Sequence, residues 1–420
     1  MSGAGMTNMP ELRFQAGMIS PAEPVAGVAH GNDGRQALAP PWEKKEFSEF
    51  VKRKSMGGNS VDLPRLEYED IVSFQGRLNN DITKKKSAKS GVLFAEGDVL
   101  FGKLRPYLGN WFLPTFNGLA VGDWWVLRPE GVDPIFLYSL IQTPIFQFVV
   151  NQSSGSKMPR ADWKLVSESV FSFPGVISEQ RKIGKFFCSL DELIAGREDA
   201  LRKLESLKKA MLEKMFPQRG AKMPKLRFKG FEGEWMVKKL GDLADIVGGG
   251  TPSTDTPEFW NGDINWFSPS EIGETVFVSD SVRKITPEGL KNSSAVILPA
   301  GKTILLTSRA TIGEMAILKA PATTNQGFQS LVVHPDVDVY FLFSCKPIIA
   351  TWAIQHAHGS TFLEISKRAL GEMTLLLPSP PEQRKIGAYF RSLDALLAAR
   401  REEVVKLKQL KNAFLERMFV

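Results

Sequence analysis

One 39-residue segment occurs twice in this chain, and the repeat limits the folds that the chain can adopt. Residues 178–216 recur without a gap as residues 381–419, at a constant offset of 203, and 22 of the 39 positions are identical. A shorter echo opens each half, because residues 9–14 (MPELRF) resemble residues 223–228 (MPKLRF). A period near 200 residues is too long for a solenoid repeat. The sequence therefore predicts two domain-plus-helix units in tandem, related by a pseudo-twofold axis.

The composition is that of a globular protein with two ordinary cores. The chain has 420 residues, 43% of them hydrophobic, and no apolar stretch of the roughly 18 residues that a membrane span needs. A signal-peptide pattern is also missing at the N-terminus, so we expect a cytoplasmic protein without a membrane partner. The only cysteines are Cys188 and Cys345, and Cys188 aligns with Arg391, so we expect no disulfide bond. A net charge of +7 favours a polyanionic partner.

The repeat divides the chain into five segments. They are an N-terminal arm (1–41), a first globule (42–177), a central helix (178–216), a second globule (217–380) and a C-terminal helix (381–420). Within the arm, residues 16–41 are rich in Gly, Ala and Pro and have no counterpart in the second half, which predicts a flexible insertion. Strand-like runs at 124–127 and 330–333, with helical patterns near 134–150 and 338–356, predict an α/β (α+β) fold for each globule.

The repeated segments carry the pattern of a coiled coil. Apolar residues recur every seven positions, and a second set follows the first by three residues. Arg197 and Arg400 interrupt the pattern, and polar residues at such positions can fix the register of two helices. The residues predicted to pair the helices or to dock a partner are Leu190, Leu193, Arg197, Leu204, Leu207, Leu393, Leu396, Arg400, Leu407 and Leu410. The alternative is that each apolar stripe packs on its own globule. Repeated surface residues such as Lys203 and Lys406 favour pairing and a shared partner.

Several motifs together resemble one protein family. They are the helix start EQRKIG, the opening L-R-F…W…L-G-D-L…G-G-G-T-P between residues 226 and 252, and the run GSTFLEIS at 359–366. In this combination the chain resembles the DNA specificity subunits of type I restriction–modification enzymes. The resemblance covers the chain except residues 16–41.

The resemblance implies an architecture and a set of partners. It implies two target recognition domains, held apart by two long antiparallel helices, that each read one half of a bipartite, asymmetric site in double-stranded DNA. It also implies that the helices dock two methyltransferase subunits and that restriction (translocase) subunits join the complex. S-adenosylmethionine, ATP and Mg are then expected on those partner subunits, with no cofactor or metal in this chain.

Loop-borne basic and polar residues are the predicted DNA contacts. Lys and Arg side chains bind phosphates, while Arg, Ser and Thr can also reach base edges. The candidates in the first domain are Lys84, Lys85, Lys86, Lys103, Arg105, Lys157 and Arg160, and those in the second are Ser308, Arg309, Thr361, Lys367 and Arg368. The repeat alignment places Arg105 near Arg309 and Lys157 near Thr361. For each basic residue the alternative is a solvated surface charge.

Catalytic patterns are missing from the sequence. The run Gly301-Lys302-Thr303 has Val296 where a phosphate-binding loop needs its first glycine. His356 and His358 lie in no cluster with metal-ligand spacing, and the tetrapeptide of an adenine methyltransferase is absent. We therefore predict a noncatalytic DNA-binding subunit. A stand-alone nuclease or DNA-modifying enzyme with an unrecognised site, and a coiled-coil scaffold without DNA affinity, remain as alternatives.

Overall fold

The chain forms two compact units that are described here one at a time. The computed structural model describes residues 42–60, 62–82, 85, 89–152, 158–359 and 363–419. Unit 1 holds Met1–Gly196 and Val404–Val420, and unit 2 holds Arg197–Glu403. The two long helices predicted from the repeat are α5 (Ile177–Met215) and α10 (Pro380–Arg417). Each unit therefore contains one globule, the first part of one long helix and the last part of the other.

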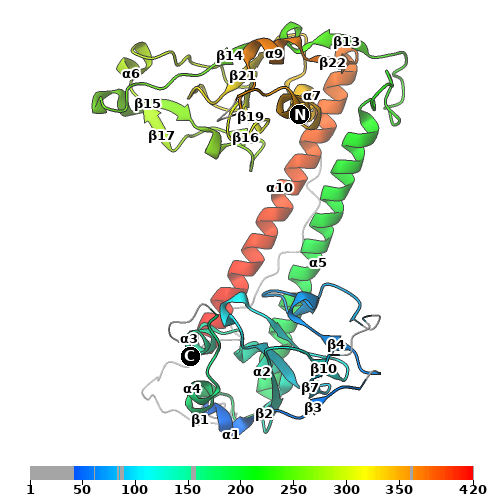
Figure 1. Cartoon of the computed structure of the whole chain (residues 1–420), viewed down its shortest axis with the longest axis vertical. Helices are drawn as coiled ribbons and strands as arrows, with labels where there is room; N and C mark the ends of the chain where they lie inside the picture. Colours follow the sequence, from blue (N-terminus) through cyan, green and yellow to red (C-terminus); the bar gives the residue numbers. More distant parts are fainter. Residues whose placement is uncertain are drawn as a thin grey trace, which may run out of the picture. The chain divides into compact units, whose positions relative to one another are not determined.

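Unit 1 is built on the four-stranded sheet β2-β11-β8-β9, which lies between two apolar cores. Figure 1 labels its edge strand β2. Alternate residues of a strand point to opposite faces, and accordingly Phe101 of β8 belongs to one core while Leu100 belongs to the other. The strands are β1 (Glu43–Glu46), β2 (Val51–Lys54), β3 (Gly57–Gly58), β4 (Arg65–Leu66), β5 (Ile71–Val72), β6 (Arg77–Leu78), β7 (Gly91–Phe94), β8 (Val99–Gly102), β9 (Trp111–Phe112), β10 (Gly118–Ala120), β11 (Trp124–Pro129) and β12 (Val170–Phe173). The short helices are α1 (Phe47–Phe50), α2 (Pro134–Leu140), α3 (Pro144–Val150) and α4 (Trp163–Glu168).

Unit 2 repeats this frame. Its five-stranded sheet β14-β21-β18-β19-β16 matches the central sheet of unit 1, and Ile304 and Leu305 of β18 again belong to two different cores. The strands are β13 (Met236–Lys239), β14 (Ala244–Gly248), β15 (Trp260–Phe267), β16 (Phe277–Val278), β17 (Arg283–Ile285), β18 (Thr303–Leu306), β19 (Met315–Leu318), β20 (Thr323–Thr324), β21 (Gln329–Val333) and β22 (Thr374–Leu377). The short helices are α6 (Pro287–Lys291), α7 (Val339–Ser344), α8 (Lys346–Gln355) and α9 (Lys367–Glu372).

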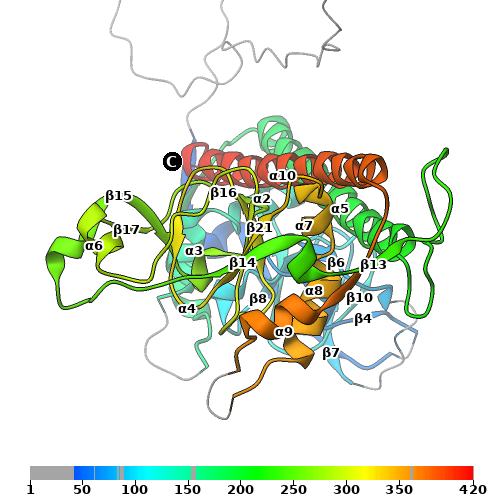
Figure 2. The same cartoon turned by 90° about the horizontal axis from the view of Figure 1, so that it is seen from above.

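The peripheral sheets distinguish the two units. Unit 1 has the four-stranded sheet β3-β7-β10-β4, whereas unit 2 has the three-stranded sheet β17-β15-β20. Figure 2 shows β15 and β17, with α6, lying beside the central sheet of unit 2. The globules are thus mixed α+β domains, as predicted, with one shared frame and different edges.

Helices α5 and α10 run antiparallel within each unit. In unit 1, Phe186 of α5 packs edge to face on Phe414 of α10, and Asp191 forms an ion pair with Lys411. The corresponding contacts within unit 2 are Lys208 with Asp394, Glu205 with Arg401, and Arg197 with Glu403. Residue numbers rise along one helix as they fall along the other, which confirms the predicted antiparallel pair (Figure 1).

The buried stripe of the helix pair differs by one residue from the predicted seam. Leu190 and Leu393 are buried, and Leu204 and Leu407 are half-buried, as expected for one half of the pattern. The other half of the seam was predicted to lie three residues after these positions. That prediction is wrong, because its four leucines are 42–44% exposed, namely Leu193, Leu207, Leu396 and Leu410. The seam continues four residues later instead, through Ile194, Lys208, Leu397, Val404 and Lys411. Apolar residues at both spacings made the sequence pattern ambiguous.

The repeated EQRKIG motif joins each long helix to its globule. The Gln180 side chain accepts a hydrogen bond from the Asp133 amide at 2.7 Å and donates one to the Pro174 carbonyl at 2.7 Å. Gln383 makes the same two bonds, with Asp338 and Pro378, each at 3.0 Å. Because Asp133 and Asp338 cap α2 and α7, one glutamine ties together a helix start, a strand end and a long helix. Across the described part of the chain, no helix is long and apolar enough to cross a membrane.

Candidate nucleic-acid interface

In unit 1 the structure brings three predicted DNA contacts together at the end of β8. The Arg105 amide donates to the Pro159 carbonyl at 2.8 Å, and Leu104 forms a β-bridge with Arg160. Lys103 and Arg160 both pair with Asp123, at 3.6 and 3.1 Å. Arg105 has a left-handed backbone with φ 49° and an exposed side chain. Such backbone strain is concentrated at functional sites, so this loop is the leading candidate for a contact with DNA in unit 1.

The same loop geometry recurs in unit 2 at the end of β18. The Ser308 amide donates to the Gly327 carbonyl at 2.7 Å, as the Lys103 amide donates to the Asp123 carbonyl at 2.9 Å. Ala310 is left-handed with φ 58° and takes the structural place of Arg105. The predicted alignment of Arg105 with Arg309 is therefore off by one residue. Arg309 corresponds to Leu104 instead.

The two predicted DNA contacts in the unit 2 loop differ in how far they are buried. Arg309 is half-buried and pairs with Glu364 at 2.8 Å. Ser308 is fully buried, and its backbone carbonyl accepts from the Ile365 amide at 3.1 Å. The prediction that Ser308 reaches a base edge is wrong for this structure, because protein atoms cover its hydroxyl group.

The remaining predicted contacts are dispersed. Lys85 lies in an acidic cluster with Glu67, Glu69 and Asp70, which engages its charge within unit 1. Lys367 and Arg368 are exposed on the first turn of α9, and neither has an ion-pair partner among the described residues. Four predicted contacts fall outside the described residues, namely Lys84, Lys86, Lys157 and Thr361.

A buried polar pair on the long helices was missed by the sequence interpretation. Lys411 is 7% exposed and contacts both Asp191 and the Gln142 side chain, the latter at 2.7 Å. Burial raises the pKa of Asp191, despite the Lys411 ammonium beside it. The equivalent pair in unit 2 is Lys208 with Asp394. Identity of these residues in both copies was the available signal, but charged residues are usually assigned to a surface.

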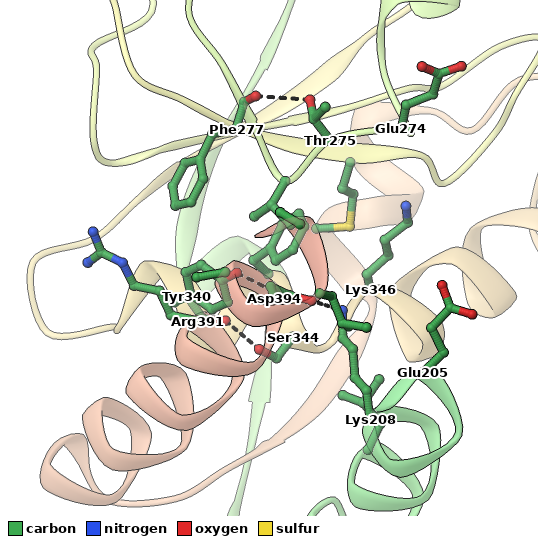
Figure 3. A pocket seen from close by; sticks show the side chains of 18 of the residues that line it. Glu205, Lys208, Glu274, Thr275, Phe277, Tyr340, Ser344, Lys346, Arg391 and Asp394 are labelled. Atoms are coloured by element: carbon green, nitrogen blue, oxygen red, sulfur yellow. Dashed lines mark hydrogen bonds and ion pairs between the residues drawn. The ribbon is translucent and has the colours of Figure 1, made fainter. Parts of the chain in front are cut away.

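Figure 3 shows the unit 2 pair at the edge of a pocket of about 1070 Å³. Asp394 accepts a hydrogen bond from the Tyr340 hydroxyl at 2.9 Å as well as the contact from Lys208. Burial, together with the Asp394 carboxylate, raises the pKa of Tyr340 far above its usual range. Across the pocket, Arg391 approaches the ring of Phe277 at 5.9 Å. These groups hold α10 against the globule and form no proton-relay or nucleophile arrangement.

The peripheral sheet of unit 2 holds a second group that the sequence interpretation missed. The guanidinium of Arg283 lies 3.6 Å from the ring centre of Trp260 and 5.4 Å from that of Trp266. The stack keeps an exposed, planar donor group in a fixed position on β17. The β15–β20 pair of this sheet resembles the parallel β4–β10 pair of unit 1, but β4 has no neighbour in the place of β17 among the described residues, so the repeat alignment could not point to Arg283. Groups of three or more potential metal ligands are absent from the described residues.

Part of the chain matches the model of a known protein family. Residues 232–407 match the family model of the type I restriction modification DNA specificity domain. The matched residues make up less than half of the chain.

Two curated relatives of this chain are specificity subunits from one organism. The chain is 38% identical over 193 residues to the type I restriction enzyme MjaIX specificity subunit of Methanocaldococcus jannaschii, a match that spans 44% of each chain. The matched part of this chain therefore spans less than half the length of that relative. The MjaVIII specificity subunit of the same organism is 24% identical over 88% of this chain and 90% of its own.

A solved structure extends the likeness to the whole fold. The S subunit of a type I restriction–modification system from M. genitalium covers 92% of this chain and 98% of its own, with a TM-score of 0.60 and 14% identity. The two chains therefore share one fold.

Proposed function

We propose that this chain is the noncatalytic specificity subunit of a type I restriction–modification enzyme and reads a bipartite, asymmetric site in double-stranded DNA. One observation carries the proposal. Both units place the same strand-end loop in the same frame, but the loop reads Lys103-Leu104-Arg105 in unit 1 and Ser308-Arg309-Ala310 in unit 2. An equal frame with different side chains suits two domains that read different base sequences.

The two roles of a DNA-binding surface are divided among the exposed residues. Arg105 and Arg309 are the proposed base-reading residues, because a guanidinium group can bond two acceptors of a guanine at once. Lys367 and Arg368 are the proposed phosphate contacts, which add affinity without sequence information. The net charge of +7 is consistent with such a surface.

The long helices are the proposed docking surface for the catalytic partners. The four leucines excluded from the seam, Leu193, Leu207, Leu396 and Leu410, form two repeated exposed sets. Two equal sets suit two copies of one partner, and we propose two methyltransferase subunits, with restriction subunits joining through them. S-adenosylmethionine, ATP and Mg would bind those partners in the cytoplasm. The family match and the shared fold support this assignment.

Alanine variants of the two loop arginines test the base-reading role. With methyltransferase subunits bound, Arg105→Ala and Arg309→Ala should each lose about 1–3 kcal/mol of discrimination at one half-site only. Competition binding with DNA altered in either half measures this loss. Lys367→Ala is the control, because loss of a phosphate contact weakens all sequences alike. If both arginine variants weaken every DNA equally, the assigned base-reading role is wrong.

A further inference from the structure

In unit 2 the side chain of Arg309 is paired with a carboxylate from a neighbouring segment. Its Nη2 atom lies 2.8 Å from Oε2 of Glu364. The backbone of Glu364 is fixed by two hydrogen bonds, because its amide donates to the His358 carbonyl at 3.1 Å and its carbonyl accepts from the His358 amide at 3.0 Å. The next residue, Ile365, donates its amide to the Ser308 carbonyl at 3.1 Å. The two charged side chains therefore meet from two segments whose backbones are joined.

The frame that the two units share does not require this ion pair. In unit 1 the Ala161 amide donates to the Lys103 carbonyl at 2.8 Å, which is the equivalent of the bond just described. The residues beside it are Leu104 and Arg160, which form an antiparallel bridge in place of the arginine and the glutamate. Unit 1 builds the same loop with a leucine and an arginine at these two positions. The ion pair is therefore particular to unit 2.

Stability also gives little reason for the pair. The side chains of Arg309 and Glu364 are 43% and 33% exposed, and ion pairs with this exposure contribute little to the stability of a fold. Among the described residues, the contact joins one nitrogen to one oxygen, so Nη1 of the arginine and Oε1 of the glutamate stay open to a ligand. The pair presents donors and an acceptor side by side on the surface.

This arrangement matches the major-groove edge of a G·C base pair. Guanine presents two acceptors there, N7 and O6, and cytosine presents the N4 amino group as a donor. A guanidinium can donate to both guanine acceptors, while a neighbouring carboxylate accepts from the cytosine amino group. An A·T pair has a donor at adenine N6 and an acceptor at thymine O4. It would therefore place donor against donor and acceptor against acceptor.

We propose that Arg309 and Glu364 together read one G·C base pair, with Arg309 on the guanine and Glu364 on the cytosine. The inference rests on the proposed function, because it requires that unit 2 reads DNA. Glu364 orients the guanidinium and also excludes base pairs that lack an amino group at this place. A carboxylate is repelled by the DNA phosphates. Its presence therefore lowers the affinity for every sequence that does not offer it a donor.

Competition binding tests the inference with the full chain in complex with its methyltransferase subunits. The probes are duplexes that carry the site read from methylated adenines in the host, with each position changed to the other base pairs. The position that Arg309→Ala relaxes should be a G·C pair. At that position, Glu364→Gln should lower the preference for G·C over A·T by about tenfold or more, because an amide can donate to thymine O4. Preferences at the other positions should stay the same.

A chemical change in the DNA and a matched variant serve as controls. N4-methylation of the same cytosine should weaken binding of the natural complex, and this penalty should disappear in Glu364→Ala, which a purely structural role of the glutamate would not produce. The matched variant is Glu234→Gln, because Glu234 forms a surface ion pair with Lys222 at 2.8 Å in the same unit. It removes the same charge and should change the preference at no position.

The outcomes separate this inference from the proposed function. If the natural complex binds all duplexes alike, the proposed function itself is wrong. If the natural complex is selective but Arg309→Ala relaxes no G·C position, the inference is overturned while the proposed function stands. The same holds if Glu364→Gln keeps the full preference for G·C, since the arginine then reads the base pair alone, or if it weakens binding to every duplex equally.

Discussion

At the residue scale, the glycine of each EQRKIG motif allows the long helix to lie against its globule. A Cβ atom on Gly184 would lie 2.8 Å from the Ile135 carbonyl carbon and 2.8 Å from the Phe136 amide, both backbone atoms of α2. Gly387 is equally constrained in unit 2, by Asp338 and the Phe341 amide. The glycine of EQRKIG is therefore a packing requirement, which explains its presence in both copies.

Alanine substitution of these glycines should destabilise the unit that contains them. Gly184→Ala should lower the free energy of unfolding by about 1–3 kcal/mol, as expected when an extra methyl group overfills a packed contact. The control is Gly196→Ala, because Gly196 has open space around it and the second copy has Ala399 there. That control should raise helix stability by up to about 1 kcal/mol. Urea unfolding monitored by circular dichroism measures both, and equal effects would contradict the packing argument.

Asp98 should make the stability of unit 1 depend on pH. Its side chain is buried beside Arg128 and Lys54 and accepts from the Ala95 amide at 2.8 Å. Burial alone would raise the pKa of Asp98, but these hydrogen bonds and charges outweigh it and lower the pKa below the usual value. The ionised form therefore stabilises the fold above the unfolded pKa of about 4, and the contribution is lost as pH falls through the lower folded pKa.

The Asp98→Asn variant measures that contribution. At pH 7 it should be less stable by about 3 kcal/mol, because two cations lose a buried partner. The difference should shrink as the pH falls below about 4. Exposed Asp336→Asn is the control and should show no such difference. A constant difference between pH 3 and pH 7 would show that Asp98 acts without ionisation.

At the element scale, the sequence was sufficient for the existence and direction of the long helices and insufficient for their seam. Repetition and leucine spacing predict α5 and α10 to within three residues at each end. The seam was misplaced because Leu193 precedes Ile194, which is about equally apolar, and Leu207 precedes Lys208, which is charged. The half-buried Lys208 and the buried Lys411 depend on acidic partners 186 and 220 residues away in sequence. Local periodicity contains no information about such partners.

Adjacent aspartate substitutions distinguish the two seams. Ile194→Asp and Leu397→Asp place a carboxylate at positions only 6% and 4% exposed and should each cost more than about 3 kcal/mol of folding free energy. Leu193→Asp and Leu396→Asp, one residue earlier, should cost less than about 0.5 kcal/mol and should impair only binding of the methyltransferase subunits. Thermal unfolding and gel filtration with that subunit separate the outcomes. If aspartate lowers the stability equally at the buried and the exposed positions, the seam with three-residue spacing is the correct one.

At the scale of the whole molecule, each compact unit draws on both halves of the chain. Unit 1 includes Leu415 and Phe419 in its core, and unit 2 includes Met215 and Phe216. The repeat predicted two units but placed each helix with one of them. Loop residues were the least predictable part, because Ser308 and Arg309 are neighbours in sequence and only the sheet decides which one is covered. The structure brings Lys103, Arg105 and Arg160 together, and their contact with DNA stays a prediction, whereas Ser308 is buried and cannot make the predicted contact.

The central claim is that each globule reads its own half of one DNA site, and a domain exchange tests it most directly. Residues 42–177 would be replaced by the equivalent segment of a related specificity subunit with a known, different target. Methylated adenines would then be mapped across the genome of a host that carries the exchanged chain and its methyltransferase subunit. If each globule reads its own half, one half of the methylated site changes while the other half and the spacer stay the same. Changes in both halves would contradict it, because the two globules would then read the DNA jointly.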